Sequence, residues 1–100
     1  MKSAAVEIVG ILDQVLAIVN HAPQELIWQS RYSDEKELVD DLTDHAQRIR
    51  QEDLSRLPDL SFLFAPTGPL CEIAASSGWL EAYTVLGNRF DELHTRLRQP

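Results

Sequence analysis

Acidic side chains on one predicted helix are the most distinctive chemistry-bearing residues of this sequence. At about 100° per residue, four of them fall on a single stripe: Asp34, Glu37, Asp41 and Asp44. Glu35 and Asp40 extend the acidic surface around the helix, and Lys36 is the one base among them. Carboxylates arranged in this way can steer a basic partner and pair with its arginines. The alternative interpretation is a solvated face whose first-turn acids favour the helix dipole.

Two aromatic residues, Trp28 and Tyr32, flank the turn that precedes this helix. Aromatic side chains beside a polar rim are typical binding anchors, although they can equally cover the end of a hydrophobic core. We expect a protein partner to pair with the acidic stripe and to pack against Trp28 and Tyr32. This expectation requires that the stripe carboxylates lie outside the fold and are not neutralised by arginines of the chain itself.

Three histidines, His21, His45 and His94, are the candidate metal ligands. Asp41 and His45 lie one helical turn apart, as do Asp91 and His94. Di-iron helical bundles use a Glu-x-x-His motif on each of two helices and two further glutamates, all facing inward. Only one pair here has that spacing, and it begins with aspartate. We therefore expect no metal site, and we expect the histidines to be surface or packing residues.

The single cysteine, Cys71, excludes an internal disulfide and is compatible with a reducing cytosol. A cysteine nucleophile needs a neighbouring base, whereas a lone cysteine is more often a small buried hydrophobic residue. The chain also lacks the G-x-S-x-G and H-E-x-x-H motifs and any phosphate-binding glycine loop. The sequence therefore predicts a protein that is not an enzyme and uses no cofactor.

Composition predicts one globular domain over residues 1–100, with 44% hydrophobic and 25% charged residues. The net charge of −7 repels nucleic acid and anionic lipid, so a protein is the expected partner. Most of this charge lies in residues 1–44, which hold nine acids and three bases. Because Glu7 and Asp13 interrupt the apolar N-terminal stretch, we expect neither a signal peptide nor a membrane span, and a cytoplasmic location.

Hydrophobic periodicity predicts an all-α fold, a small bundle of three long helices with shorter helices between them. The expected long helices cover 4–20, 34–51 and 79–97, and the shorter ones 23–28, 54–64 and 69–76. Ser3 and Ser33 are the expected N-caps of the first two long helices. Regular helix in the third segment is expected to start around Pro58, and Gly78 is expected to take a left-handed conformation.

The last predicted helix carries one continuous apolar seam at steps of four and three residues: Trp79, Tyr83, Leu86, Phe90, Leu93 and Leu97. Such a seam can form the internal core of a bundle or the contact face of a coiled-coil dimer. In a chain of this length the core is the expected use, and a homodimer is the alternative.

Several strings in the C-terminal half resemble a signature of small bacterial immunity proteins that are encoded beside polymorphic toxins. These strings are Leu63-Phe64-Ala65-Pro66-Thr67-Gly68-Pro69-Leu70, Glu72-Ile73, Gly78-Trp79 and Arg89-Phe90-Asp91. The resemblance covers about residues 54–93. It implies a protein that binds one cognate toxin domain and blocks its active site. The matching residues are of structural types, so the first half of the chain would have to confer partner specificity.

The leading hypothesis is therefore a toxin-neutralising immunity protein that acts by steric and electrostatic occlusion. Its expected partner is a cognate toxin domain, of basic character if charge guides the encounter. The alternative is a non-catalytic helical module that self-associates or regulates a partner protein.

Overall fold

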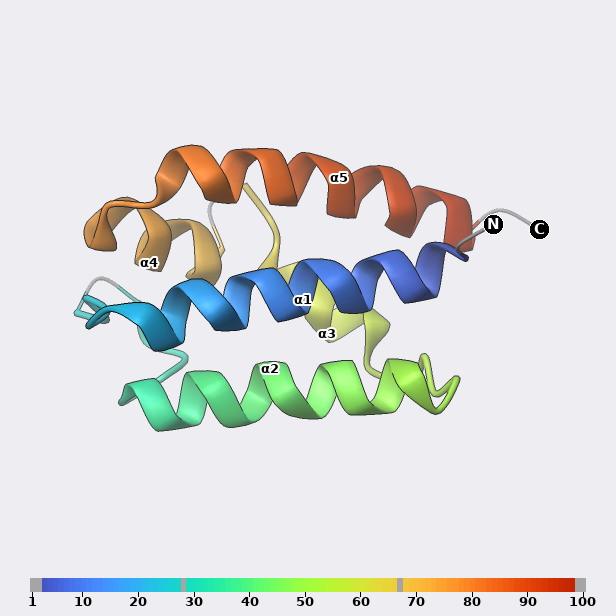
Figure 1. The fold of residues 1–100 in the computed structure, drawn as a ribbon, viewed down its shortest axis with the longest axis horizontal. Coiled ribbons are helices and arrows are strands. Elements are labelled where there is room, and N and C mark those ends of the chain that lie inside the picture. Colours follow the sequence, from blue (N-terminus) through green and yellow to red (C-terminus); the bar gives the residue numbers. More distant parts are fainter. Residues whose placement is uncertain (1–2, 28, 67, 99–100) are drawn as a thin grey trace.

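A computed structural model of the chain describes residues 3–27, 29–66 and 68–98. Within these residues the chain forms five helices and no strand, which confirms the all-α fold class. The helices are α1 (Ala4–His21), α2 (Glu35–Arg50), α3 (Leu57–Leu63), α4 (Pro69–Ser77) and α5 (Leu80–Arg98) (Figure 1). They contain 18, 16, 7, 9 and 19 residues respectively.

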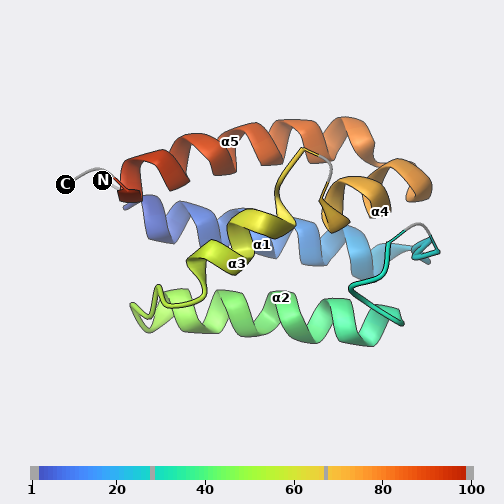
Figure 2. The same ribbon diagram turned by 180° about the vertical axis from the view of Figure 1, so that it is seen from behind.

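Helix α1 is the central element, and it packs against α2 on one side and α5 on the other (Figure 1). Figure 2 shows α3 crossing one face of α1, between α2 and α5. Ile8, Leu12 and Val15 of α1 have no exposed surface because neighbours enclose this helix on several sides. This face of α1 is therefore buried in the core, whereas Val6 on the same helix is 57% exposed.

The seam along α5 lies in the core, as expected. Tyr83, Phe90 and Leu93 are buried, and the ring of Phe90 stacks on Phe64 with the ring centroids 4.4 Å apart. Trp79 is also buried, and its indole nitrogen donates a hydrogen bond to Gln24 Oε1 (2.7 Å). Because these side chains pack inside the monomer, they are not available as a coiled-coil face.

Most of the expected helix boundaries are confirmed, with one change of N-cap. The Ser3 side chain accepts a hydrogen bond from the Val6 amide (3.1 Å), α3 has a proline in its first turn, and Gly78 has φ 88°. The expectation that Ser33 caps the second long helix is wrong. Asp34 occupies that position, with its carboxylate accepting a hydrogen bond from the Glu37 amide (2.8 Å). Asp and Ser are equivalent N-caps, so composition could not distinguish them.

The connection between α1 and α2 differs from the expected short helix at 23–28. Its described residues are not helical, and Trp28 lies outside the described residues. Hydrogen bonds tie this segment to its surroundings instead: the Gln24 amide donates to Glu35, and the Glu25 amide donates to Ser77 Oγ of α4 (2.8 Å). Tertiary contacts therefore replace the local helical bonds that the sequence pattern predicted.

The third helix starts at Leu57, next to Pro58, which confirms the expectation that regular helix begins around this proline; residues 54–56 of the predicted range lie outside it. In the turn before the helix, Asp53 accepts a hydrogen bond from the Ser55 amide (2.9 Å). The side chain of Arg56, which precedes the helix, donates hydrogen bonds to Asp41 and Asp44 of α2.

Helix α1 has the length and the mean hydropathy (18 residues, 1.4) of a segment able to cross a membrane. Because α1 contains Glu7 and Asp13, it is not an uncharged apolar stretch, and the expectation of no membrane span stays a prediction. A core helix and a signal sequence both pass the same test. The cytoplasmic location therefore stays a prediction.

The glycine before α4 offers a test of the packing between α3 and α4. A Cβ atom at Gly68 would lie 2.7 Å from the Phe62 carbonyl oxygen and 3.0 Å from that of Leu63. Because backbone must move to admit it, we expect Gly68→Ala to lower the free energy of unfolding by about 1–3 kcal/mol in urea denaturation. Gly10→Ala is the control, since nothing lies within 4 Å of a Cβ there. That variant should gain up to about 1 kcal/mol. Equal effects at the two sites would contradict this packing.

Candidate functional site

A cluster of charged side chains joins α2 to α3 and to the segment that precedes α2. We call it the Arg56 cluster, and its members are Arg31, Tyr32, Asp41, Asp44, His45, Arg56 and Asp59. Asp44 and His45 follow Asp41 by three and four residues, so both lie on the same side of α2 as Asp41. That face is turned towards Arg56 and Asp59.

Arg56 holds the cluster together by donating to three carboxylates. Its Nη1 atom donates to Asp44 Oδ2 (2.7 Å), and its Nη2 atom donates to Asp41 Oδ1 (3.0 Å) and Asp59 Oδ2 (2.6 Å). Burial alone would lower the pKa of Arg56, but hydrogen bonds to these carboxylates outweigh burial and raise it. The guanidinium therefore stays charged and binds α2 and α3 together.

Two further arginines neutralise the outer carboxylates. Arg31 Nη2 donates to both oxygens of Asp59 (2.9 and 2.8 Å), and Arg48 Nε donates to Asp44 Oδ2 (2.8 Å). Hydrogen bonds from Arg48 and Arg56 lower the pKa of Asp44. Burial would raise the pKa of Asp59, but the hydrogen bond from Arg56 and the charges of Arg31 and Arg56 lower it. Both acids are ionised at neutral pH.

Tyr32 is buried against this cluster, with 5% of its surface exposed. Its hydroxyl donates to Asp41 Oδ2 (2.6 Å). Burial, and then the hydrogen bond to Asp41, raise the pKa of Tyr32 well above its ordinary value. The phenol is therefore a fixed hydrogen-bond donor and not an acid or base at neutral pH.

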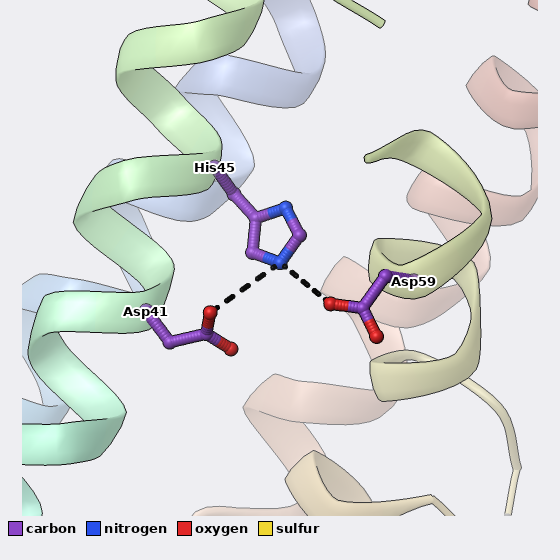
Figure 3. A group of neighbouring side chains, drawn as sticks. All are labelled: Asp41, His45 and Asp59. Atoms are coloured by element: carbon purple, nitrogen blue, oxygen red, sulfur yellow. Dashed lines mark ion pairs between the residues drawn. The ribbon is translucent and has the colours of Figure 1, made fainter. Parts of the chain in front are cut away.

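His45 is the most deeply buried polar residue of the cluster, with 1% of its surface exposed. Its Nε2 atom lies 3.4 Å from Asp59 Oδ2 and 3.9 Å from Asp41 Oδ1, and it makes no hydrogen bond to the described residues (Figure 3). Burial, and then the charge of Arg56, lower the pKa of His45. The imidazole is consequently neutral at pH 7.

Asp41, His45 and Asp59 together form a possible set of metal ligands, since one ligand atom from each lies within 4.8 Å of the others. Imidazole and carboxylate suit a zinc-type ion. However, Arg56 Nη2 donates to the two carboxylate oxygens nearest to His45. A cation between them would have to displace this guanidinium and would remain close to its charge. The geometry favours a structural ion-pair cluster over a metal centre.

These contacts determine which of the residues expected to bind a partner are available to do so. The stripe is not free as a whole: Asp41 and Asp44 are neutralised by Arg56, and Tyr32 is buried and therefore not an exposed anchor. Asp34 and Glu37 remain exposed at the start of α2, where Glu37 accepts a hydrogen bond from the Ser33 amide (3.2 Å). Nothing in the structure tests whether a partner binds these residues.

The sequence analysis missed Arg56 and Asp59 as the partners of the stripe. Both lie at least twelve residues beyond Asp44, in a segment singled out only for its apolar side. Their spacing of three residues at the start of a helix is compatible with an ion pair, which forms at 2.6 Å. That signal alone could not show that the pair would face α2.

The other candidate side chains have structural environments. His21 is exposed, and His94 stacks on Phe90 with ring centroids 5.6 Å apart, which confirms surface and packing roles for these histidines. Cys71 is half-buried and packs against the core.

Comparison of the chain with protein-family models, with characterised proteins and with solved structures finds no match. The function must therefore be argued from the chain itself.

Replacing Arg56 tests its role in the cluster. We expect Arg56→Ala to lower the free energy of unfolding by about 2 kcal/mol, because it removes hydrogen bonds to three carboxylates in a partly buried site and leaves only Arg31 beside Asp41 and Asp59. Arg50→Ala is the control, since Arg50 makes one exposed ion pair, with Asp13 (3.1 Å), and should cost less than about 1 kcal/mol. Equal losses in urea denaturation would show that Arg56 is an ordinary surface arginine.

His45 should make stability depend on pH. Folding lowers its pKa below the ordinary 6.5, so the unfolded chain binds more protons as the pH falls through that value. Stability is therefore expected to fall between pH 7 and pH 5. Asp41 and Asp44 on α2, and Arg56 and Asp59 beside α3, are the charged groups that face the ring.

The measurement is the urea midpoint at pH 7 and at pH 5. His45→Gln should show a smaller difference between the two values than the wild type. The matched control is His21→Gln, which replaces an exposed histidine and should retain the wild-type difference. An unchanged difference in His45→Gln would rule out this histidine as the source.

Proposed function

We propose that this protein is an immunity protein that binds a cognate toxin domain and occludes its active site. The observation that carries the proposal is the charge that the fold leaves without neutralisation. Of the sixteen acidic residues, eight form no ion pair with any described residue. These eight are Glu25, Asp34, Glu35, Glu37, Glu52, Glu72, Glu81 and Asp91. Uncompensated negative surface attracts a basic macromolecule and accelerates its association.

The charged side chains that do form ion pairs are bonded within the fold, which supports a binding role over a catalytic one. The Arg56 cluster contains the histidine, carboxylates and phenol that could do acid–base chemistry. Its members are bonded to one another, and His45 is enclosed by the fold. A general base must reach a proton of its substrate, which an enclosed side chain cannot do.

The size and packing of the domain also suit an inhibitor. A continuous core runs through all five helices, so the scaffold loses little conformational freedom on binding. A typical interface buries about 800 Å² on each partner, which two adjoining elements of this chain can present. The resemblance over residues 54–93 points to the same class of protein.

A second candidate function is a helical module that self-associates. It is favoured by large apolar side chains that the monomer leaves in contact with solvent, among them Ile27, Phe62 and Val85. Such residues are also common on monomeric proteins when they are scattered singly. The unneutralised acids would repel one another across a symmetric interface, and for this reason we place the candidate second.

Co-expression tests the proposed function. The proposal requires a toxin domain encoded by a neighbouring gene. A bacterial strain that produces that domain should stop growing, and expression of this protein should restore growth. The purified pair should form a complex whose association slows as salt is added, because charge guides the encounter. A catalytically inactive toxin variant serves as the binding partner in purification.

The outcome that contradicts the proposal is a protein that neither restores growth nor binds the toxin domain. A tight homodimer in sedimentation, together with that failure, would favour the self-associating module instead.

A further inference from the structure

The acids without an ion pair are unevenly distributed along the molecule. Six of the eight belong to elements that meet at one end, where α1 finishes, α2 and α5 begin, and α4 lies (Figures 1 and 2). We call this the acidic end, and its residues are Glu25, Asp34, Glu35, Glu37, Glu72 and Glu81. Hydrogen bonds from the Gln24 amide to Glu35 and from the Glu25 amide to Ser77 Oγ fasten its elements together.

Helix dipoles account for only part of this charge. Glu35 and Glu37 in α2 and Glu81 in α5 occupy first turns, where acids stabilise a helix. Glu25 lies in the segment between α1 and α2, and it has no such role. Glu72 does lie in the first turn of α4, but it also lines a surface groove. Asp34 is the N-cap of α2, so Glu25 is the one member of the acidic end that lies outside a helix cap or first turn.

The groove that Glu72 lines is open and partly apolar, with a volume of about 490 Å³. It runs between the segment before α2 and the junction of α3 with α4. Ile27 and Phe62 stand on its walls with 76% and 57% of their surfaces exposed. Arg31, the one base in the lining, is already paired with Asp59. The unpaired charge in this groove is therefore negative.

We infer that this groove, flanked by the acidic end, is where a basic protein partner inserts an apolar side chain that has lysine or arginine beside it. Glu72 in the wall is placed to pair with one of those cations, and Glu25, whose Oε1 accepts a hydrogen bond from the Ile27 amide (3.0 Å), belongs to the acidic end outside the lining. Charge complementarity favours this occupant, because Glu72 forms no ion pair with a described residue and the acidic end beside the groove would repel an acidic segment. A buried apolar anchor inside a polar rim is the usual composition of a strong contact. The inference rests on the proposed function and locates its interface.

The opposite end of the molecule shows why a second copy is a competing occupant. Arg96 and Arg98 at the end of α5 form no ion pair with the described residues, and Leu97 lies between them. The arginines at the end of α5 and the acidic end lie at opposite ends of the long dimension of the molecule, which is 39 Å. One copy could therefore place these arginines against the acidic end of the next copy. Such a head-to-tail contact does not close and would produce concentration-dependent oligomers.

A peptide titration tests the groove without a toxin. The probe is a synthetic peptide with one leucine flanked on each side by two arginines, and its control has serine in place of leucine. Titration of isotope-labelled protein should shift the amide resonances of residues that line the groove, and the leucine peptide should bind at least fivefold more tightly. Shifts spread over the whole surface, or equal affinities for the two peptides, would overturn the inference.

Matched variants test the same groove with the toxin domain. Phe62→Ser and Glu72→Gln should each weaken the complex at least tenfold. Val85→Ser and Glu52→Gln are the controls, since they remove an equally exposed apolar residue and an equally unpaired acid outside the groove. Circular dichroism confirms that each variant is folded. Wild-type affinity in both groove variants would overturn the placement and leave the immunity function standing.

Failure of the function itself gives a different pattern. In that case the wild type does not bind the toxin domain, and the peptide titration still decides whether the groove accepts a basic, apolar segment. Sedimentation at low salt shows whether a second copy of the chain, and not a foreign partner, occupies the groove. Oligomers that are lost in both Glu72→Gln and Arg98→Ser would assign the groove to a second copy and overturn the inference of a foreign partner.

Discussion

The interaction between Arg56 and three aspartates determines which acidic side chains of α2 and α3 are neutralised within the fold. One guanidinium donates to Asp41, Asp44 and Asp59, which come from two different helices. Like charges at this spacing would repel one another without a cation between them, and Arg31 reduces the same repulsion through its ion pairs with Asp59 and Asp41. The Arg56 contact encloses His45 and gives Asp41 its place beside the buried hydroxyl of Tyr32.

The cluster distinguishes acids that arginines of the chain neutralise from acids that form no ion pair with the described residues. Asp41 and Asp44 belong to the first group although they share a stripe with Asp34 and Glu37. Most acids of the second group lie where α2 and α5 begin and where Ser77 of α4 meets the segment before α2. A surface for a basic partner is therefore produced by the meeting of several chain segments and not by one helix alone.

Much of the fold could be predicted because its signals are local. Apolar spacing along α1 and α5 indicated which faces are buried, and Pro58 and Gly78 marked a helix start and a helix end through their backbone restrictions. The segment at 23–28 was predicted wrongly for the opposite reason. Its Gln24 and Glu25 amides donate to Glu35 and Ser77, which are remote in the sequence, so local propensity had no information about these two bonds.

By itself, the sequence determined the fold class, the composition of the core and the excess of negative charge, since periodicity and composition act within each helix and over the chain as a whole. Only the tertiary structure decided which acids are neutralised. Hydrogen bonds need donor and acceptor within about 3 Å, and salt screens the attraction between exposed charges beyond about 8–10 Å, so the state of a carboxylate depends on whether an arginine distant in the sequence is brought next to it. Asp44 meets Arg56 twelve residues away, whereas Glu72 meets no base among the described residues.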